Sequence, residues 1–338
     1  MKKIIVLILL FNITAIFAGD VSRKGTTGAD QLFIPVGARS IATSGAFVAS
    51  VMGAEAIYYN PAGLNRSKGS EAMFSYMNYI ADINVSYLGV AGYLGDLGSI
   101  AFFMKSFDIG DIEQTTVNDP DGNGVFYSPS LYTFGISYSK LVTDRVSVGV
   151  NLKMINESIM STSTTGFAVD FGVQYAFTDN FHIGVVVNNV GGNMKYDGQD
   201  LQTKTNLPGS YPGSATATYT AVTEEFQIPS YYELSLAYKF NLDAANGLAL
   251  GGVFRNNNNL EDEMRFGLEY DYSRMFYLRG GYTLMMENSD QAIYSYTIGA
   301  GINVKLMDAL NARFDYAFRP VENFPTDNHV FTLMLGVN

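Results

Sequence analysis

The residues best placed to do chemistry are charged side chains on the polar face of alternating segments. Lys153 and Asp170 lie on consecutive segments, and so do Glu269 and Arg279. These charges would either line a wide aqueous pore or pair across a packed interior, because unpaired buried charges are costly. The chemistry that they indicate is ion pairing. The full set of expected inward-facing charges is Lys153, Asp170, Glu233, Glu269, Arg279, Arg313 and Asp315.

No combination of residues predicts catalysis. Ser137 and Lys140 have the spacing of a Ser-x-x-Lys pair, but that pair needs a helical turn and this stretch alternates as a strand. The two histidines, His182 and His329, stand alone on candidate strands and are interpreted as wall residues. We therefore expect a protein that is not an enzyme.

A short acidic loop has part of the pattern of a calcium site. Residues 119–124 read Asp-Pro-Asp-Gly-Asn-Gly, which offers oxygen ligands at alternate positions and a glycine for the turn. Ser130 stands where a bidentate acid is expected, and Asp, Pro, Gly and Asn are also ordinary loop residues. The sequence leaves calcium binding open, and no cofactor is expected.

The elements that must position the charged residues are β-strands. Residues 146–154 alternate between aliphatic and polar side chains, and residues 167–177, 232–240 and 310–319 repeat the pattern. Such alternation fits a soluble sandwich or a membrane barrel. Segments of about ten residues, aromatic residues near strand ends and the absence of Cys from an exported chain favour the membrane. The predicted fold is all-β, a transmembrane up-and-down antiparallel β-barrel.

About fourteen strands are predicted, within a barrel domain spanning residues 71–338. The candidate strands cover residues 72–80, 85–94, 98–106, 131–140, 145–156, 165–177, 181–188, 230–240, 247–255, 264–273, 275–284, 294–305, 309–319 and 328–337. Short turns are expected at 143–144, 178–180 and 273–274, on the periplasmic side. Long outer loops are expected at 107–130, 157–164, 189–228, 256–263, 285–293 and 320–327.

The longest loop, 189–228, is rich in Tyr, Thr, Gly and Pro. A loop of this length is usually functional or disordered, so a binding surface and a mobile tip are both retained. As a binding surface it would present Tyr211, Tyr219 and Phe226 to a partner.

The start of the chain predicts export. Lys2 and Lys3 precede an apolar run, and residues 16–18 offer a small residue for cleavage, so residues 1–18 are interpreted as a signal peptide. Removing the two lysines changes the formal charge from −11 to −13. This acidic balance argues against nucleic acid as a partner.

Residues 19–70 are predicted to form a plug inside the barrel. The stretch from Gly37 to Leu64 is rich in small residues and has no charge between Arg39 and Glu55. Small residues also recur on the inward face of the strands, which favours a filled lumen over an open pore. The simpler alternative is a tight turn before the first strand. The expected inward-facing glycines are Gly149, Gly172, Gly267, Gly299 and Gly301.

The same stretch resembles the N-terminal signature of PorV/PorQ-type outer-membrane proteins, which belong to the FadL-like superfamily of long-chain fatty-acid transporters. The signature reads Gly-Ala-Arg, then Gly-Ala-Phe-Val-Ala, then Ala-x-Tyr-Tyr-Asn-Pro-Ala-Gly-Leu. The residues that match it most specifically are Gly37, Ala38, Arg39, Gly45, Ala46, Phe47, Asn60, Pro61, Ala62 and Gly63.

The resemblance implies a fourteen-stranded barrel in the bacterial outer membrane with an N-terminal segment inside it. PorV-type relatives serve type IX secretion by receiving cargo through its C-terminal domain and shuttling it to the attachment machinery. The fatty-acid transporters instead pass hydrophobic molecules through a lateral opening. Three hypotheses follow: a cargo shuttle, a transporter of hydrophobic molecules, and a structural barrel. The implied partners are outer-membrane lipid, the C-terminal domain of secreted proteins with type IX components, or a hydrophobic ligand.

Overall fold

The computed structural model describes residues 24–206, 209–211, 213–287 and 292–337. The signal peptide predicted over residues 1–18 lies outside the described residues. Within the described part, no helix is long and apolar enough to cross a membrane.

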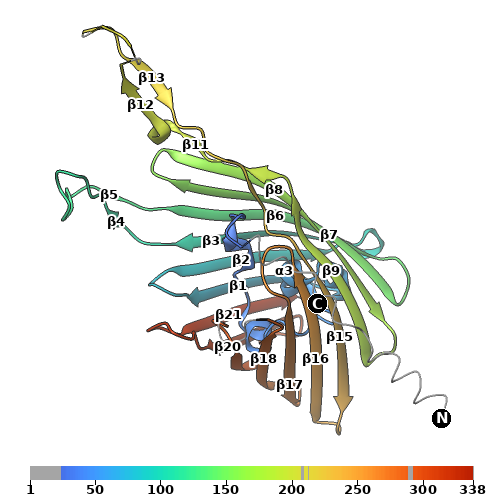
Figure 1. Ribbon diagram of the computed structural model, residues 1–338. Coiled ribbons are helices and arrows are strands. Elements are labelled where there is room, and N and C mark those ends of the chain that lie inside the picture. Colours follow the sequence, from blue (N-terminus) through green and yellow to red (C-terminus); the bar gives the residue numbers. More distant parts are fainter. Residues whose placement is uncertain (1–23, 207–208, 212, 288–291, 338) are drawn as a thin grey trace.

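Fourteen long antiparallel strands form one closed barrel (Figure 1). Each strand pairs with its neighbours along the chain, and the β8–β9 and β1–β21 pairings complete the circle. The barrel strands are β1 Ser70–Asn78, β2 Asn84–Tyr93, β3 Ser99–Asp108, β6 Ser130–Leu141, β7 Val146–Ile159, β8 Thr162–Ala176, β9 Phe181–Gly191, β15 Tyr231–Asn241, β16 Asn246–Asn257, β17 Glu263–Tyr272, β18 Phe276–Met285, β19 Tyr296–Lys305, β20 Leu310–Arg319 and β21 Asn328–Val337.

All fourteen predicted strands are confirmed, but one predicted loop is wrong. Residues 157–164 are not a long loop, because β7 and β8 stay paired as far as Ile159 and Thr162. A tight turn joins them, with Met160 at a φ of 50°. The Thr and Ser residues at 161–165 suggested a loop, yet alternating β-branched residues extend the ladder when the partner strand is long.

The long connections gather at one end of the barrel, here called the loop end, and the short ones at the opposite turn end. Two hairpins project from the loop end (Figure 1): the β4–β5 arm, residues 109–129, and the β12–β13 arm, residues 199–221. The small strands of the loop end are β4 Ile112–Glu113, β5 Phe126–Tyr127, β10 Asn193–Met194, β11 Asp197–Gly198, β12 Gln202–Thr205, β13 Ala217–Thr220 and β14 Phe226–Gln227.

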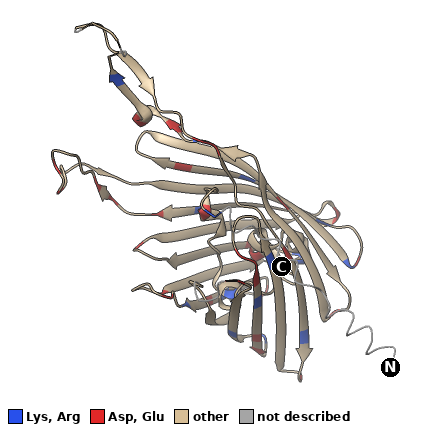
Figure 2. Ribbon diagram, in the orientation of Figure 1, with Lys and Arg blue, Asp and Glu red and all other residues tan. Residues whose placement is uncertain are grey.

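The outward face of the wall is apolar. Leu152, Phe167 and Leu278 are each more than half exposed, and the residues between them on the same strands turn inward. Figure 2 shows long tan stretches of strand without charged residues, with many of the charged residues in the loops and near strand ends. An apolar outer band with polar side chains turned inward is the arrangement that lipid requires.

The plug, residues 24–69, runs through the lumen as short helical turns before β1. Its last turn begins at Asn60, whose side-chain oxygen accepts a hydrogen bond from Ala62 N, and Pro61 occupies the first helical position. The helical turns are η2 Asp30–Phe33, α2 Ala38–Ala42, η3 Gly53–Glu55, α3 Ala56–Tyr59 and η4 Pro61–Arg66, and two more, η5 Gly95–Leu97 and η6 Gln199–Leu201, lie outside the plug.

Candidate functional site

A belt of seven inward-facing glycines holds the plug against the wall. An ideal Cβ on any of them would lie within 2.8 Å of an atom in the plug, so the plug occupies the space of the missing side chains. On β15, which lies between β9 and β16, Ser235 stands at the belt position instead of a glycine. Its hydroxyl accepts a hydrogen bond from Ala49 N of the plug. The glycine belt consists of Gly149, Gly172, Gly184, Gly251, Gly267, Gly281 and Gly299.

Most of these contacts are made to plug backbone, which cannot swing aside. A Cβ on Gly149 would lie 2.4 Å from Ala62 N, and one on Gly281 would lie 2.4 Å from Ser44 N. Of the five glycines expected to face inward, only Gly301 has no plug atom among its nearest neighbours, since Asp315 and Arg279 fill its surroundings. Glycine on a strand thus permits close approach of a second backbone, here that of the plug.

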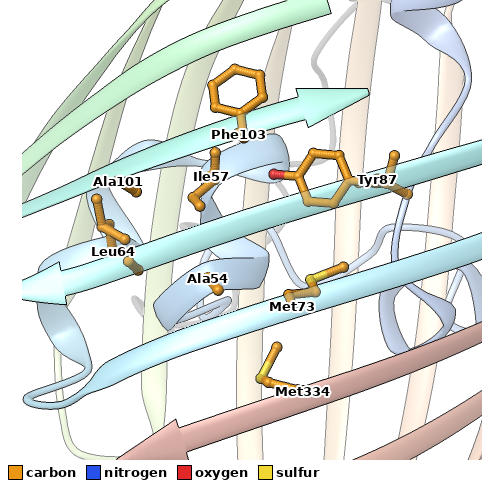
Figure 3. Close-up of a cluster of buried hydrophobic side chains, with 10 residues drawn as sticks. Ala54, Ile57, Leu64, Met73, Tyr87, Ala101, Phe103 and Met334 are labelled. Carbon is orange, nitrogen blue, oxygen red and sulfur yellow. The ribbon is translucent and has the colours of Figure 1, made fainter. Parts of the chain in front are cut away.

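An apolar cluster fixes one side of the plug (Figure 3). Ala54, Ile57 and Leu64 of the plug pack against side chains of β1, β2, β3 and β21. Tyr87 and Phe103 stack there with ring centroids 6.2 Å apart. This packing covers the side of the plug that faces away from most of the glycine belt.

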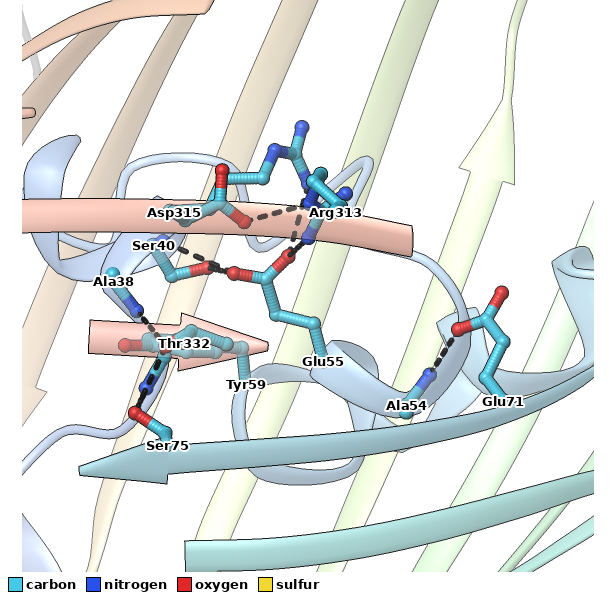
Figure 4. A network of polar contacts seen from close by, with 12 residues as sticks. Ala38, Ser40, Ala54, Glu55, Tyr59, Glu71, Ser75, Arg313, Asp315 and Thr332 are labelled. Carbon is cyan, nitrogen blue, oxygen red and sulfur yellow. Dashed lines mark hydrogen bonds and ion pairs between the residues drawn. The ribbon is translucent and has the colours of Figure 1, made fainter. Parts of the chain in front are cut away.

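A buried carboxylate anchors the plug beside this cluster (Figure 4). Glu55 accepts hydrogen bonds from Ser40 N at 3.0 Å and from Ser40 Oγ at 2.7 Å. Its second oxygen pairs with Arg39 at 3.2 Å and with Arg313 of β20 at 3.3 Å. One acid therefore ties two plug helices to the wall.

The Glu55 pairs are part of a network of six charges. Arg39 binds Glu269 of β17 at 2.8 Å, Glu269 binds Arg279 at 2.6 Å, and Arg279 binds Asp315 at 2.7 Å. Arg313 closes the chain to Asp315 at 2.7 Å. The three acids balance the three arginines, so the buried charges are paired, as their burial requires. Arg279 Nη2 is the one nitrogen of the three guanidinium groups that is buried without a hydrogen-bond partner among the described residues.

Two plug residues in this network have altered titration. Burial alone would raise the pKa of Glu55, but Arg39, Arg313 and the Ser40 hydroxyl outweigh it and lower that pKa below its usual value. Burial likewise opposes the charge on Arg39, yet Glu269 and Glu55 raise its pKa well above normal. Both groups therefore stay charged at neutral pH.

The other expected inward charges form two smaller groups. Glu233 accepts from Arg255 at 2.7 Å and from Arg265 at 3.3 Å, and Arg265 also binds Glu263. Lys153 pairs with Asp170 at 2.7 Å. Asp170 also accepts a hydrogen bond from Asn151, whose amide donates to the plug carbonyl of Ile57. The structure thus places all seven predicted charges inside the lumen, and Asn151, Arg255 and Arg265 were not anticipated as their partners.

The motif residues of the plug fulfil backbone and packing roles. Gly37 and Gly45 have φ values of 82° and 69°, which a residue with a side chain rarely adopts. Asn60 donates to Val48 O and Val173 O, which joins two plug segments to β8. Ala46 and Phe47 are buried against the wall. None of these roles requires a ligand.

The wall beside the plug is continuous except at one place. Strands β1, β2, β3 and β6 pair in uninterrupted register. The described ladders contain one shift, between Val169 and Phe171 where β8 meets β9, and there Asn189 N donates to Asp170. This shift lies close to the plug turn at Asn60–Gly63, because Asn60 Nδ2 donates to Val173 O of β8 and an ideal Cβ on Gly172 would lie 2.1 Å from Asn60 Oδ1.

A cavity of about 700 Å³ lies between the plug and the wall at the loop end. Plug residues Tyr58 and Tyr59 form part of its lining, together with strand ends from β3, β16 to β20 and nearby loops. Sequence reasoning missed this cavity, because its lining residues come from segments that are distant in the chain.

The candidate partner residues of the longest loop separate into two groups. Tyr211 is 86% exposed and Tyr219 is 37% exposed on the β12–β13 arm. Phe226 instead packs on Tyr196, with centroids 5.4 Å apart, and contacts the plug cluster of Ala29 and Leu32. Only the two tyrosines are available to a partner.

The remaining candidate residues lie in ordinary surroundings. His329 stacks on Tyr316 on the outer face, and His182 contacts Asp179 O. In the acidic loop, Asp119 accepts from Thr116 and Glu113 accepts from Gly124 N. Over the described residues, no group of three His, Asp or Glu side chains gathers to hold a metal.

Comparison with known proteins agrees with this geometry. The family model for type IX secretion system protein PorV matches residues 18–256. Comparison with curated protein sequences found no match. Among solved structures, the chain is similar to the CymD monoaromatic hydrocarbon channel, with 12% identity, a TM-score of 0.57 and coverage of 90% of this chain and 97% of that one.

Two further solved structures have the same fold. A Pseudomonas aeruginosa FadL homologue has 13% identity and a TM-score of 0.55, covering 90% of this chain and 98% of that one. The Pseudomonas putida toluene transporter TodX has 14% identity and a TM-score of 0.55, covering 90% and 97%. The fold and family are those of transport proteins rather than of enzymes. The chain belongs to the PorV family and is a β-barrel of the bacterial outer membrane with the FadL-like fold.

Proposed function

We propose that this protein is a non-enzymatic shuttle of type IX secretion that holds an exported protein at its loop end by that protein's C-terminal domain. Membership of the PorV family supports the link to type IX secretion. The observation that supports the proposal is the close fit of the plug in the lumen, where the glycine belt and the six-charge network hold it against the wall. The binding surface is then the loop end, which faces the outside in barrels of this kind.

The β12–β13 arm is the proposed main contact for cargo. It stands away from the barrel (Figure 1), and every residue of β12 is exposed. Tyr211 and Tyr219 offer rigid aromatic surface with a polar tip, a combination enriched at protein interfaces. The outer edges of β12 and β13 carry backbone groups to which an extended partner segment can pair.

The β4–β5 arm adds a charged surface. The segment from Asp108 to Ser130 contains five acidic and no basic residues. Val117 is fully exposed at its tip. This arm favours a partner with a basic face, and the attraction will weaken as salt is added.

Replacing residues 204–218 by a short Gly-Ser turn tests the proposal. We expect the variant barrel to insert normally and to keep its heat-modifiable migration on gels, while cargo no longer co-purifies with it in mild detergent. The control shortens the 306–309 connection at the turn end in the same way and should retain cargo. Undiminished cargo capture by the arm variant would contradict the proposed surface.

Transport of a hydrophobic molecule is the second candidate function. Two of the similar structures are a hydrocarbon channel and a toluene transporter. In this chain a path through the lumen would have to pass the plug, and the backbone contacts of the glycine belt argue against it. A path through the wall would have to use the register shift between β8 and β9, where Asn189 N donates to Asp170. We therefore favour the shuttle.

A further inference from the structure

The register shift where β8 meets β9 turns an additional polar side chain toward the lumen. Neighbouring residues of a regular strand point to opposite faces, yet Asn188 and Asn189 are both only 1% exposed. Asn189 has a φ of 60°, a left-handed conformation that Asn adopts more readily than most residues. A shift of this kind re-aims a side chain, and here it brings a carboxamide into the lumen instead of leaving it on the lipid face.

An amine, a carboxamide and a carboxylate meet beside the shift. Lys153 Nζ lies 2.7 Å from Asn189 Oδ1 and 2.7 Å from Asp170 Oδ2. The other oxygen of Asp170 accepts a hydrogen bond from Asn189 N at 2.8 Å. Asn189 Nδ2 donates to Pro229 O, which fixes the plane of the carboxamide. The three side chains come from β7, β8 and β9, and all of them are buried.

A second buried lysine of the lumen has different surroundings. Lys105 is 2% exposed, and its ammonium donates to the backbone carbonyls of Gln31 and Ile34. Among the described residues, no carboxylate or side-chain amide accepts a hydrogen bond from it. Lys105 therefore has hydrogen-bond partners but no group with which an amine could condense, whereas Lys153 has both an amide carbon to attack and an acid to carry the proton.

We propose that Lys153 and Asn189 are joined by an intramolecular isopeptide bond. Burial disfavours a charged pair relative to a neutral one, so an ammonium proton passes to Asp170 along their hydrogen bond. The neutral Nζ then forms a bond to Asn189 Cγ, and the bond from Cγ to Nδ2 breaks. Asp170 gives its proton to the leaving nitrogen and takes one from Nζ. Ammonia departs, Asp170 ends as a neutral acid, and no oxidant or cofactor is consumed.

The bond would close the wall where its ladder is irregular. It links β7 to β9 across β8, beside the one register shift of the described ladders. The chain has no Cys, so a disulfide cannot supply such a link. Strands joined in this way cannot part at the shift, and a path through the wall is blocked there. This inference goes beyond the proposed shuttle function and does not depend on it.

Mass spectrometry of the protein purified from its own outer membrane and then denatured tests the proposal. Trypsin would cleave an unmodified chain after Lys153 into peptides 146–153 and 154–195. An isopeptide bond removes the charge that trypsin requires, so we expect a single peptide 146–195 that is lighter by ammonia, about 17 Da. Cyanogen bromide cleaves after Met154 and Met160 and should leave fragments 105–154 and 161–194 joined, with the link located at Asn189 in their fragment spectra.

Three variants assign the roles. Asn189→Ala removes the acceptor carbon and should give separate fragments of unmodified mass. Asp170→Ala keeps both partners but removes the proton carrier, and the joined fraction should fall at least tenfold. Lys105→Met is the matched control, because it removes the other buried lysine and should leave the fragments joined. Heat-modifiable migration on gels shows that each variant has formed its barrel.

The measurement on the unmodified chain decides the inference whether or not the variants fold. Separate peptides 146–153 and 154–195 from that chain would overturn it. So would a loss of about 17 Da without joined fragments, since that result shows ammonia lost at a single Asn. Fragments joined to the same extent in folded Asp170→Ala would overturn the role of Asp170 in the reaction.

Discussion

Adding one methyl group to the glycine belt should release the plug. The Cβ of Gly281→Ala would lie 2.4 Å from both Ser44 N and Thr43 C, which are backbone atoms that cannot rotate away. The adjacent Gly280 faces the opposite side of β18, and an added Cβ there meets nothing closer than 4.0 Å. The two substitutions therefore change the same strand by the same group, and only one of them touches the plug.

The size of the effect follows from the cost of overpacking. Forcing a methyl group into a filled contact costs about 1–3 kcal/mol. If the barrel strands hold their register, this cost falls on plug docking and raises the undocked population about 5- to 150-fold. Gly280→Ala should leave that population unchanged.

The chain has no Cys, so Val48→Cys provides a unique probe of undocking. Val48 is 1% exposed and is packed between the plug and the wall. Its maleimide labelling rate reports the open population when opening is fast relative to the reaction. Equal labelling rates in the Gly281→Ala and Gly280→Ala backgrounds would refute the idea that plug backbone occupies the missing side-chain space.

Further predictions concern the polar anchors of the plug. Glu55→Gln keeps the shape of the side chain but leaves Arg39 and Arg313 with one fewer acid, so plug docking should weaken by about 3 kcal/mol, measured by the same labelling rate. Because the pKa of Glu55 is lowered, its contribution is fully present above the usual value of 4.5 and is lost as pH falls through the lower folded value. Hydrogen exchange in the plug should therefore be constant from pH 8 to 5 once corrected for intrinsic rates, and protection should fall at more acidic pH; a Glu55→Gln variant with the same acid response would contradict this. Lys105→Met removes the ammonium that donates to Gln31 O and Ile34 O, so exchange should rise about tenfold at residues 29–34 and stay unchanged at 56–66. Acceleration throughout the plug would show that Lys105 is not a local anchor.

The strands were predictable because lipid imposes a strict period of two. Residues 146–154 show it plainly, with Val146, Val148 and Val150 on one face and Ser147 and Gly149 on the other. Membrane strands must also be long, so each segment offers several repeats of the pattern. The 160–161 turn was missed because polar residues of a strand beyond the bilayer look like those of a loop.

The plug was predictable as an element but its contacts were not. Small residues and the Asn60-Pro61 turn indicated close packing, since both are needed where backbones meet. The partners of Arg39 and Glu55 lie more than 200 residues away on β17 and β20. Such pairs depend on barrel closure and strand register, which local sequence patterns do not specify.

The positions of the loop residues were likewise not predictable from local sequence patterns. Tyr219 and Phe226 have similar aromatic character in the sequence, yet one is exposed on an arm and the other packs beside Gly28 of the plug. That difference arises because the chain crosses back over the lumen mouth at Gln227, where it pairs with Thr27. No spacing rule in the sequence indicates this crossing.

The most direct test of a sealed barrel that works from its loop end is to lock the plug in place. Ser44 Oγ and Thr297 Oγ1 are 3.1 Å apart across the plug–wall boundary, so Ser44→Cys with Thr297→Cys can form a disulfide in a chain that has no other Cys. The control is Asn156→Cys with Thr165→Cys, because these residues are partners on the wall strands β7 and β8, with Asn156 Nδ2 and Thr165 Oγ1 3.0 Å apart.

The measurement is the amount of type IX cargo at the cell surface with each disulfide oxidised and then reduced. We expect equal secretion for the locked plug, the control pair and the unmodified chain. Secretion that stops only when the Ser44–Thr297 pair is oxidised, and returns on reduction, would show that the plug must move. That result would contradict a shuttle that works from its loop end with the plug in place.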